Sequence, residues 1–225
     1  MGSWGAFGKI PSLGDFLRAD APPGFVDAWD GWLQGSLLTA RRELGQRWQP
    51  CYLSAPIWRF TIAPALAGRL PVAGILMPSV DRVGRQFPLT LMAALPQGTP
   101  EALWHFASEP VFARLEDLAL ETLERGLERG QLLQRLSGLP RATAPPPPRL
   151  IDRDGAILAM PAQDRSLAAE VAACLLEGRL RRPALWSTLL AEGARLMVTD
   201  GLPGDGHAAA LFDMSAPAWS AGGQT

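Results

Sequence analysis

Residues 51–95 read CYLSAPIWRFTIAPALAGRLPVAGILMPSVDRVGRQFPLTLMAAL and contain three apolar runs of strand length. The runs cover residues 51–62, 72–77 and 87–95, and the segments between them are rich in Pro and Gly, which end strands and form turns. Three consecutive strands with short connections pair most simply as an antiparallel meander. The third run is apolar almost throughout, which is typical of a strand covered on both faces. This stretch therefore predicts the centre of a sheet.

Patterns of helical period flank the meander. From Phe25 to Trp48 apolar residues recur every three or four positions, and two prolines that suit a first helical turn precede them. Farther along, the sequence predicts, at approximate bounds, a helix at 110–136, a strand at 150–160, a helix at 164–180, strands at 184–190 and 195–199, and a helix at 206–212. Strands and helices mix without strict alternation, which predicts an α+β fold: a largely antiparallel sheet layered with helices in a single compact domain.

Two segments fall outside this pattern. Residues 140–149 include four consecutive prolines, so they suit neither a helix nor an inner strand. We expect a Pro-rich excursion that serves as a spacer or, alternatively, as a peptide ligand for an aromatic groove. Residues 216–225 are expected to form a flexible C-terminal tail. The predicted domain therefore spans residues 1–215.

Composition and charge exclude several classes of protein. Of the 225 residues, 48% are hydrophobic and 19% are charged, which excludes wholesale disorder, and the formal net charge of −1 argues against a nucleic-acid partner. No apolar run reaches the ~18 residues that span a bilayer and no secretory signal opens the sequence, so no membrane insertion is expected. Two cysteines provide no disulfide framework, and the sequence predicts a cytoplasmic protein.

The sequence does not match the known motifs for catalysis or cofactor binding. The Gly-rich start lacks the spacing of a phosphate loop and of a dinucleotide fingerprint. The two histidines, His105 and His207, lack a surrounding nucleophile motif and are predicted to be structural, and Cys51 and Cys174 sit in apolar contexts. No cluster has metal-ligand spacing. We therefore predict no enzymatic activity, no cofactor and no metal; an enzyme would need a pocket that holds a histidine with a perturbed pKa.

Two loops combine glycines, prolines and aromatic residues with a few charges. They are residues 5–16, GAFGKIPSLGDF, and residues 78–88, PSVDRVGRQFP. Their candidate partner-binding residues are Lys9, Asp15, Asp81, Arg82 and Arg85. In a structural interpretation the aspartates cap turns while the cations are solvated or pair with them. In a functional interpretation the loops adjoin and present a charged patch to a partner or an anionic ligand.

The eight tryptophans divide by their position in the sequence. Four of them follow the periodic segments and are predicted to lie mainly in the core: Trp29, Trp32, Trp48 and Trp58. Trp4 and Trp219 lie near the ends of the chain and are the better candidates for the surface. Tryptophan is a favoured interface anchor because it combines a large apolar area with a polar edge.

Both loops and a third stretch resemble the TagF family, also called ImpM, of proteins associated with type VI secretion in bacteria. Residues 5–16 resemble the opening signature of that family, and residues 78–90 resemble its middle signature. Near the end, Leu185-Trp186-Ser187 and Gly201-Leu202-Pro203 are similar to its Leu-Trp-Trp and Gly-Leu-Pro elements, with Ser187 in place of the second Trp. The resemblance covers roughly residues 4–213.

The resemblance implies an antiparallel sheet between helices and a cytoplasmic, non-enzymatic protein. It implies a post-translational regulator that represses assembly of the secretion apparatus by binding its forkhead-associated scaffold protein. The alternative is a ligand-sensing domain that binds a nucleotide or a phosphorylated segment through Lys9, Arg82 and Arg85. The two hypotheses differ in what they require: the regulator needs an exposed patch, and the sensor needs its cations to converge on a cleft.

Overall fold

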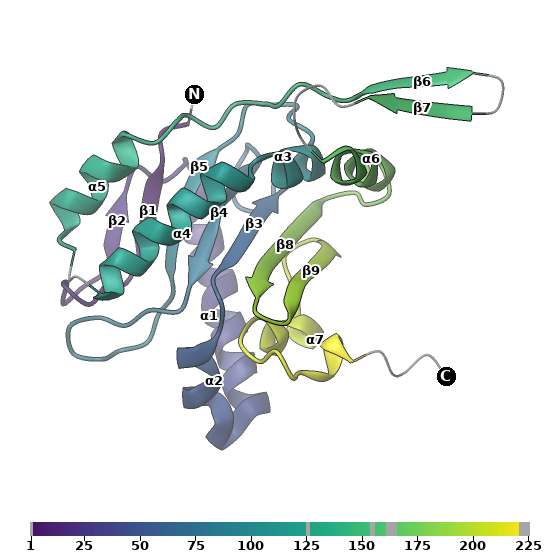
Figure 1. The fold of residues 1–225 in the computed structure, drawn as a ribbon. Helices are drawn as coiled ribbons and strands as arrows, with labels where there is room; N and C mark the ends of the chain where they lie inside the picture. Colours follow the sequence, from purple (N-terminus) through teal and green to yellow (C-terminus); the bar gives the residue numbers. More distant parts are fainter. Residues whose placement is uncertain (1, 125–126, 154–155, 161–165, 221–225) are drawn as a thin grey trace.

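One seven-stranded antiparallel sheet organises the structure, a computed structural model that describes residues 2–124, 127–153, 156–160 and 166–220. The strand order is β2-β1-β5-β4-β3-β8-β9. The strands are β1 Gly5–Gly8, β2 Leu17–Ala19, β3 Trp58–Ile62, β4 Val72–Met77, β5 Leu89–Ala94, β8 Pro183–Leu190 and β9 Gly193–Asp200. Helices cover both faces, so the predicted α+β fold is confirmed (Figure 1).

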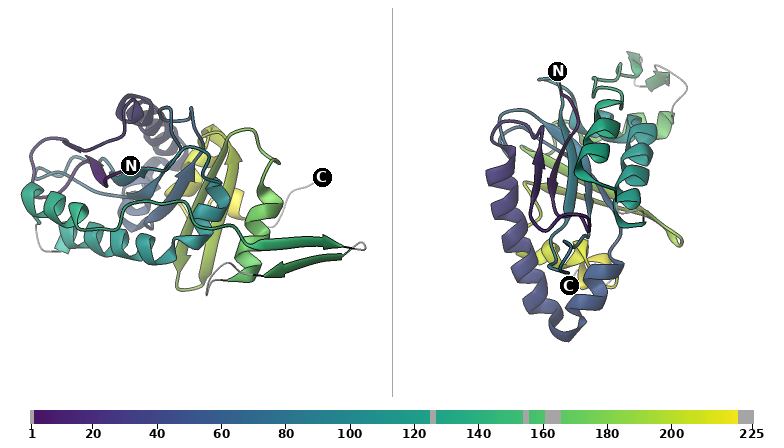
Figure 2. Two further views of the ribbon diagram at one scale, coloured as in Figure 1. Left: turned by 90° about the horizontal axis from the view of Figure 1, so that it is seen from above. Right: turned by 90° about the vertical axis from the view of Figure 1, so that its left-hand side faces the viewer.

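The helices form one layer on each side of the sheet. They are α1 Phe25–Leu44, α2 Trp48–Ser54, α3 Glu101–Ala107, α4 Glu109–Glu124, α5 Arg129–Ser137, α6 Leu167–Leu176 and α7 Asp205–Ala208. Figure 2 (right) shows α1 on one face of the sheet and α4 and α5 on the other. Within the described part of the chain, no helix is both long and apolar enough to cross a membrane.

Alternation along the central strands builds two cores. Along β4, Val72 and Leu76 point to the core under α1, whereas Ala73, Ile75 and Met77 point to the core under α4 and α5. Both sets are buried, so each face of the strand needs apolar side chains. The predicted meander of β3, β4 and β5 is confirmed, with β4 paired to both neighbours.

The first predicted strand begins too early. Residues 51–54 belong to α2, and β3 starts only at Trp58. Trp48 and Tyr52 lie one helical turn apart and are both buried, so the helical pattern continues past the end of α1. Pro50 is compatible with it because it falls in the first turn of α2, where its missing N–H is not needed.

The predicted helix at 110–136 is wrong as one element, because the region forms two helices, α4 and α5, and a third helix, α3, precedes it. Pro110 lies in the first turn of α4, where it can start a helix but cannot continue α3. Glu128 caps α5 in a capping box with Gln131, which begins a separate helix. Residues 125–126 lie outside the described residues.

The predicted strand at 150–160 is two strands that pair with each other and not with the main sheet. β6, Arg149–Arg153, and β7, Ala156–Met160, form a hairpin that extends away from the body beside α6 (Figure 1). Asp-Gly at 154–155 is a strong hairpin signal that the prediction overlooked. The next predicted helix, at 164–180, is α6 and is shorter, Leu167–Leu176.

The segment before the hairpin has no helix or strand from residue 140 to residue 148, as expected, but its start is tied to the domain. The indole N–H of Trp4 donates to the carbonyl of Pro140 at 2.7 Å, and that of Trp104 donates to Thr143 at 3.0 Å. Trp4 is only 2% exposed, so its expected place at the surface is wrong. It lies in the core shared by α5 and β1, where proximity to the N-terminus does not imply exposure.

The C-terminal residues return to the core. Strands β8 and β9 are confirmed, and the last predicted helix is α7 followed by a 3₁₀ turn, Ala209–Leu211. Trp219 stacks on Trp58 with ring centroids 5.8 Å apart, and its N–H donates to the carbonyl of Ala210. Residues 216–220 of the expected tail therefore contact the domain, and residues 221–225 lie outside the described residues.

Candidate interaction site

The loop after β1 and the loop between β4 and β5 lie against each other. β1 and β5 are paired neighbours, so the loops at this end of them meet. The amide of Arg82 donates to the carbonyl of Leu13 at 2.9 Å, and the guanidinium of Arg85 donates to the carbonyl of Gly14 at 2.7 Å. The loops that the sequence singled out thus form one continuous surface region.

Asp81 holds this region together from inside. One carboxylate oxygen accepts from Lys9 Nζ at 2.9 Å and from Arg85 Nε at 2.6 Å. The other accepts from the amides of Val83 and Arg85 at 3.1 and 2.9 Å. Lys9 and Asp81 are 6% and 2% exposed. Their positions support a structural role for both, because a buried charge needs a partner and each supplies one.

The pKa of Asp81 reflects this environment. Burial by itself would raise that pKa, because it penalises the carboxylate. The hydrogen bonds from Lys9, Arg85 and Val83 outweigh burial and hold the pKa well below its usual range. Asp81 is therefore charged at any physiological pH, and the loop keeps its shape.

A second anchor fixes the start of the same loop. The hydroxyl of Tyr52, in α2, donates to the carbonyl of Ser79 at 2.7 Å and accepts from the Ser79 amide at 3.0 Å. Tyr52 is fully buried. A buried hydroxyl that serves both backbone groups of one residue leaves the loop little freedom.

Several side chains on this framework point to solvent. We call Asp15, Phe16, Arg82, Val83 and Arg85 the loop patch, and all five are exposed. Val83 is 70% exposed and Phe16 is 44% exposed. The carboxylate of Asp15 accepts from the Phe16 amide. The patch combines two guanidinium groups, a carboxylate and two apolar side chains, which is a composition suited to protein contacts.

Phe16 is exposed on one side and held on the other. Its ring stacks on Phe7 at 5.9 Å, meets Phe87 edge-on at 4.8 Å, and lies 5.2 Å from Lys9 Nζ. The ammonium group faces the ring in the geometry of a cation–π contact. Phe16 and Val83 are not among the candidate residues predicted from the sequence, although their position between the charges of a Gly-rich loop is a signal for them.

Arg41 adds a cation that the sequence analysis missed. Arg41, Trp48, Gly84, Arg85 and Gln86 line a shallow polar hollow beside the loop patch. The Arg41 guanidinium lies over the Trp48 ring at 5.2 Å and donates to Gln86 at 3.4 Å. Arg41 is in α1 and 44 positions from Arg85, so no spacing in the sequence could link them.

His105 lies elsewhere, in a buried chain of hydrogen bonds. Its Nδ1 is 3.0 Å from the Thr61 hydroxyl and its Nε2 is 2.8 Å from the Ser187 hydroxyl. Burial, together with the charge of Arg59, lowers the pKa of His105 to about 3. Such an imidazole is a weak base at neutral pH, and a hydroxyl stands where a catalytic triad has a carboxylate. This geometry favours a structural role; His207 is exposed, in α7.

The described residues contain no group of three or more His, Cys, Asp or Glu side chains that could hold a metal ion.

Comparisons with known proteins agree with this fold. Residues 5–139 match the TagF N-terminal domain, described as type VI secretion system-associated. The structure is similar to the crystal structure of PA0076 from Pseudomonas aeruginosa PAO1, with a TM-score of 0.73 and 32% identity over 95% of each chain. A search of curated proteins found no match. The matched residues include both loops of the patch.

Proposed function

Because the chain belongs to the TagF family of type VI secretion system-associated proteins, we propose that it is a non-enzymatic repressor of that apparatus. It acts after translation, in the cytoplasm, by binding the forkhead-associated scaffold protein of the apparatus. Occupying a scaffold prevents assembly without making or breaking a bond, so this function requires a binding surface and no reactive centre.

The observation that carries the proposal is the rigid support beneath the loop patch. Phe16, Val83 and Arg82 are exposed, while the network centred on Asp81 fixes the loops that carry them. A surface that is ordered before binding loses less conformational entropy when the partner docks. Aromatic and Arg side chains are also those that dominate binding energy at interfaces.

A second candidate function, the sensing of an anionic ligand, has one favourable observation. Arg41 and Arg85 border the same polar hollow, and Arg82 belongs to the same loop. Lys9 does not contribute a free charge, since its ammonium group is buried against Asp81. A nucleotide or phosphorylated segment bound here would raise Tm in a thermal-shift assay, and the variant Arg41→Ala would abolish that rise.

The experiment measures binding of the purified chain to the purified forkhead-associated scaffold protein by calorimetry. The test variant is Arg82→Glu with Val83→Asp, which changes two exposed side chains and keeps Asp81. The control is Arg114→Glu, which changes an exposed residue on α4 that is not part of the loop patch. Circular dichroism checks that each variant folds.

We expect the loop variant to bind at least about 10-fold more weakly and the control to bind like the wild type. Equal binding by all three proteins would remove the loop patch from the mechanism. No binding by the wild-type chain would reject the scaffold as the partner.

A further inference from the structure

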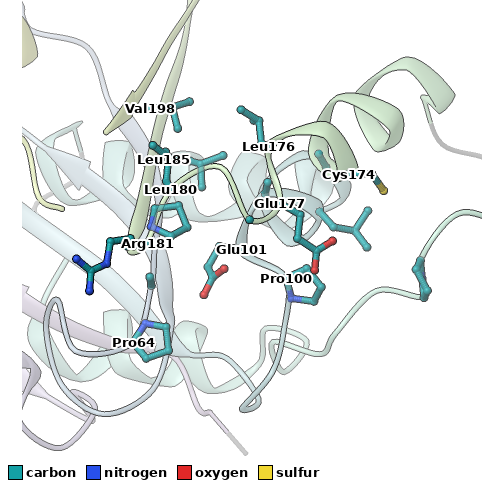
Figure 3. A pocket seen from close by; sticks show the side chains of 17 residues that line it. Pro64, Pro100, Glu101, Cys174, Leu176, Glu177, Leu180, Arg181, Leu185 and Val198 are labelled. Atoms are coloured by element: carbon teal, nitrogen blue, oxygen red, sulfur yellow. The ribbon is translucent and has the colours of Figure 1, made fainter. Parts of the chain in front are cut away.

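A cavity of about 370 Å³ lies where α3, α6 and the β8–β9 end of the sheet meet (Figure 3). Its walls are mainly apolar and include Pro64, Pro100, Leu103, Leu176, Leu185 and Val198. The volume is within the range of about 300–1,000 Å³ typical of small-molecule sites and far above that of one water molecule. The cavity is separate from the loop patch, and the two share no residue.

Carboxylates give this apolar cavity its charge. Glu101 comes from the first turn of α3 and Glu177 follows α6 directly, and both line the cavity (Figure 3). Burial, and then the charge of Glu177, raise the pKa of Glu101. Among the described residues neither carboxylate forms an ion pair. The charge of the exposed Glu177 thus acts on the half-buried Glu101, and a cation bound between them would stabilise both carboxylates.

The other polar groups of the cavity do not cancel this charge. Arg181 also lines the cavity, but its guanidinium points away from Glu101 and Glu177 (Figure 3). Cys174 also lines it, and burial together with Glu177 and Glu170 raises the pKa of its thiol, so the sulfur remains protonated and neutral. The titratable and charged groups around the space are therefore two carboxylates, one guanidinium and one neutral thiol.

We propose that this cavity binds a ligand with an apolar chain that ends in an ammonium or guanidinium group. The apolar walls bury the chain, and Glu101 and Glu177 receive the cation. A small free amine and the side chain of a Lys or Arg in a peptide share this chemistry. The exposed position of Glu177 places the charged end of the ligand near solvent, which limits the cost of removing water from it.

The test uses three probes with the same six-carbon chain and different end groups: n-hexylamine, hexan-1-ol and hexanoate. Affinity is measured by calorimetry at pH 7.5, where hexylamine is a cation. We expect hexylamine to bind at least about 10-fold more tightly than hexanol, and hexanoate to bind most weakly. Equal binding of all three probes, or no binding of hexylamine, would overturn the proposal.

Variants link the preference to the two carboxylates. Glu101→Gln with Glu177→Gln removes both charges at nearly constant shape, and we expect the amine then to bind no better than hexanol. Glu192→Gln is the matched control, since Glu192 is an exposed carboxylate at the β8–β9 turn and does not line the cavity. If the double variant keeps the preference for the amine, the carboxylates are not the cation site.

Two further experiments ask whether the probes bind in the cavity and whether the ligand is a free amine or a peptide side chain. Ala102→Phe fills the cavity from α3 and should abolish binding of every probe; continued binding would place the probes elsewhere. Displacement of hexylamine by a peptide with a free Lys side chain and an acetylated N-terminus would point to a peptide side chain as the ligand, whereas a failure of that peptide to displace it would point to a small free amine. Because this cavity is not part of the loop patch, these results do not depend on scaffold binding.

Discussion

His105 and Asp81 are both buried, but the structure keeps Asp81 charged and His105 neutral. Asp81 stays ionised because Lys9 and Arg85 surround it with positive charge. His105 stays neutral because burial and the charge of Arg59 disfavour its protonated form. The Ser187 hydroxyl forms the hydrogen bond at the second ring nitrogen of His105, Nε2. Each of these two buried groups thus has its own hydrogen-bond partners.

The first prediction concerns the pH dependence of stability. His105 is neutral in the folded protein, whereas an unfolded His binds a proton near pH 6.5. Stability from the neutral imidazole is therefore present above pH 6.5 and is lost as pH falls from there toward the folded pKa of about 3. We expect His105 to contribute a loss of about 2 kcal/mol in unfolding free energy between pH 7 and pH 5.

Urea unfolding at several pH values measures how the unfolding free energy changes with pH. The variant His105→Gln keeps a group that can bond to Thr61 and Ser187 but does not titrate, so its pH dependence should be flatter by that amount. His207→Gln changes an exposed histidine and should leave the slope of the wild type unchanged. Parallel pH curves for the wild type and His105→Gln would contradict a neutral, buried His105.

At the scale of elements, the close approach of the β1 backbone to the start of β5 positions the two loops that carry the loop patch. β1 pairs with β5, and Gly8, the last residue of β1, has a φ of 128°. A Cβ at Gly8 would lie 2.1 Å from the carbonyl oxygen of Pro88, so the two backbones require glycine there. Gly84, in the loop between β4 and β5, also has a positive φ of 83°, but a Cβ there would meet open space.

These two glycines make a matched pair. Gly8→Ala should lower the unfolding free energy by at least about 2 kcal/mol, because strain at φ and a backbone clash add. Gly84→Ala should cost only about 1 kcal/mol, which is the conformational penalty alone. Chemical denaturation of both variants gives the comparison. Equal losses would mean that β1 can move away from the β5 side without cost.

Another link between elements joins the sheet to helix α4. The Arg59 side chain on β3 is only 5% exposed and donates to Glu116 of α4 at 2.6 and 2.8 Å, and also to Glu109. Burial would lower the pKa of Arg59, but the hydrogen bonds to the two glutamates outweigh it and raise the pKa. The guanidinium thus ties the start of α4 to the middle of the sheet.

At the scale of the whole molecule, the two faces of one sheet belong to two hydrophobic cores. We therefore expect that neither core unfolds without the other. Leu33 belongs to the core under α1, and Leu115 belongs to the core under α4; both are fully buried. We expect one cooperative transition in which far-UV circular dichroism and tryptophan fluorescence coincide. Leu33→Ala and Leu115→Ala should each move that same transition and lower the unfolding free energy by about 2–5 kcal/mol.

Denaturant titrations with both probes decide this point. Leu38→Ala is the control, since Leu38 lies on α1 beside the core but is 61% exposed, and it should change stability by less than about 0.5 kcal/mol. Two separate transitions, each moved by only one of the core variants, would show that the two layers are independent folding units.

The sequence by itself determined the features that follow from local periodicity. The apolar run of β4 and the pair β8–β9 were predicted within a few residues, and the three- and four-residue spacing located α1. Such patterns indicate which side chains of a helix or strand are buried, and the pattern of each element lies within its own residues. The antiparallel α+β fold followed, since strands joined by short turns have few other ways to pair.

Only the tertiary structure decided which buried groups meet. The sequence places Lys9 and Asp81 72 positions apart, and their ion pair exists because β1 lies beside β5. For the same reason Trp4 is buried, and the packing of α1 on the sheet brings Arg41 to the hollow beside the loop patch. The cavity beside α6 is likewise formed by segments that the chain keeps far apart. Local pattern fixes which faces are apolar, whereas long-range pairing and packing choose each side chain's neighbours.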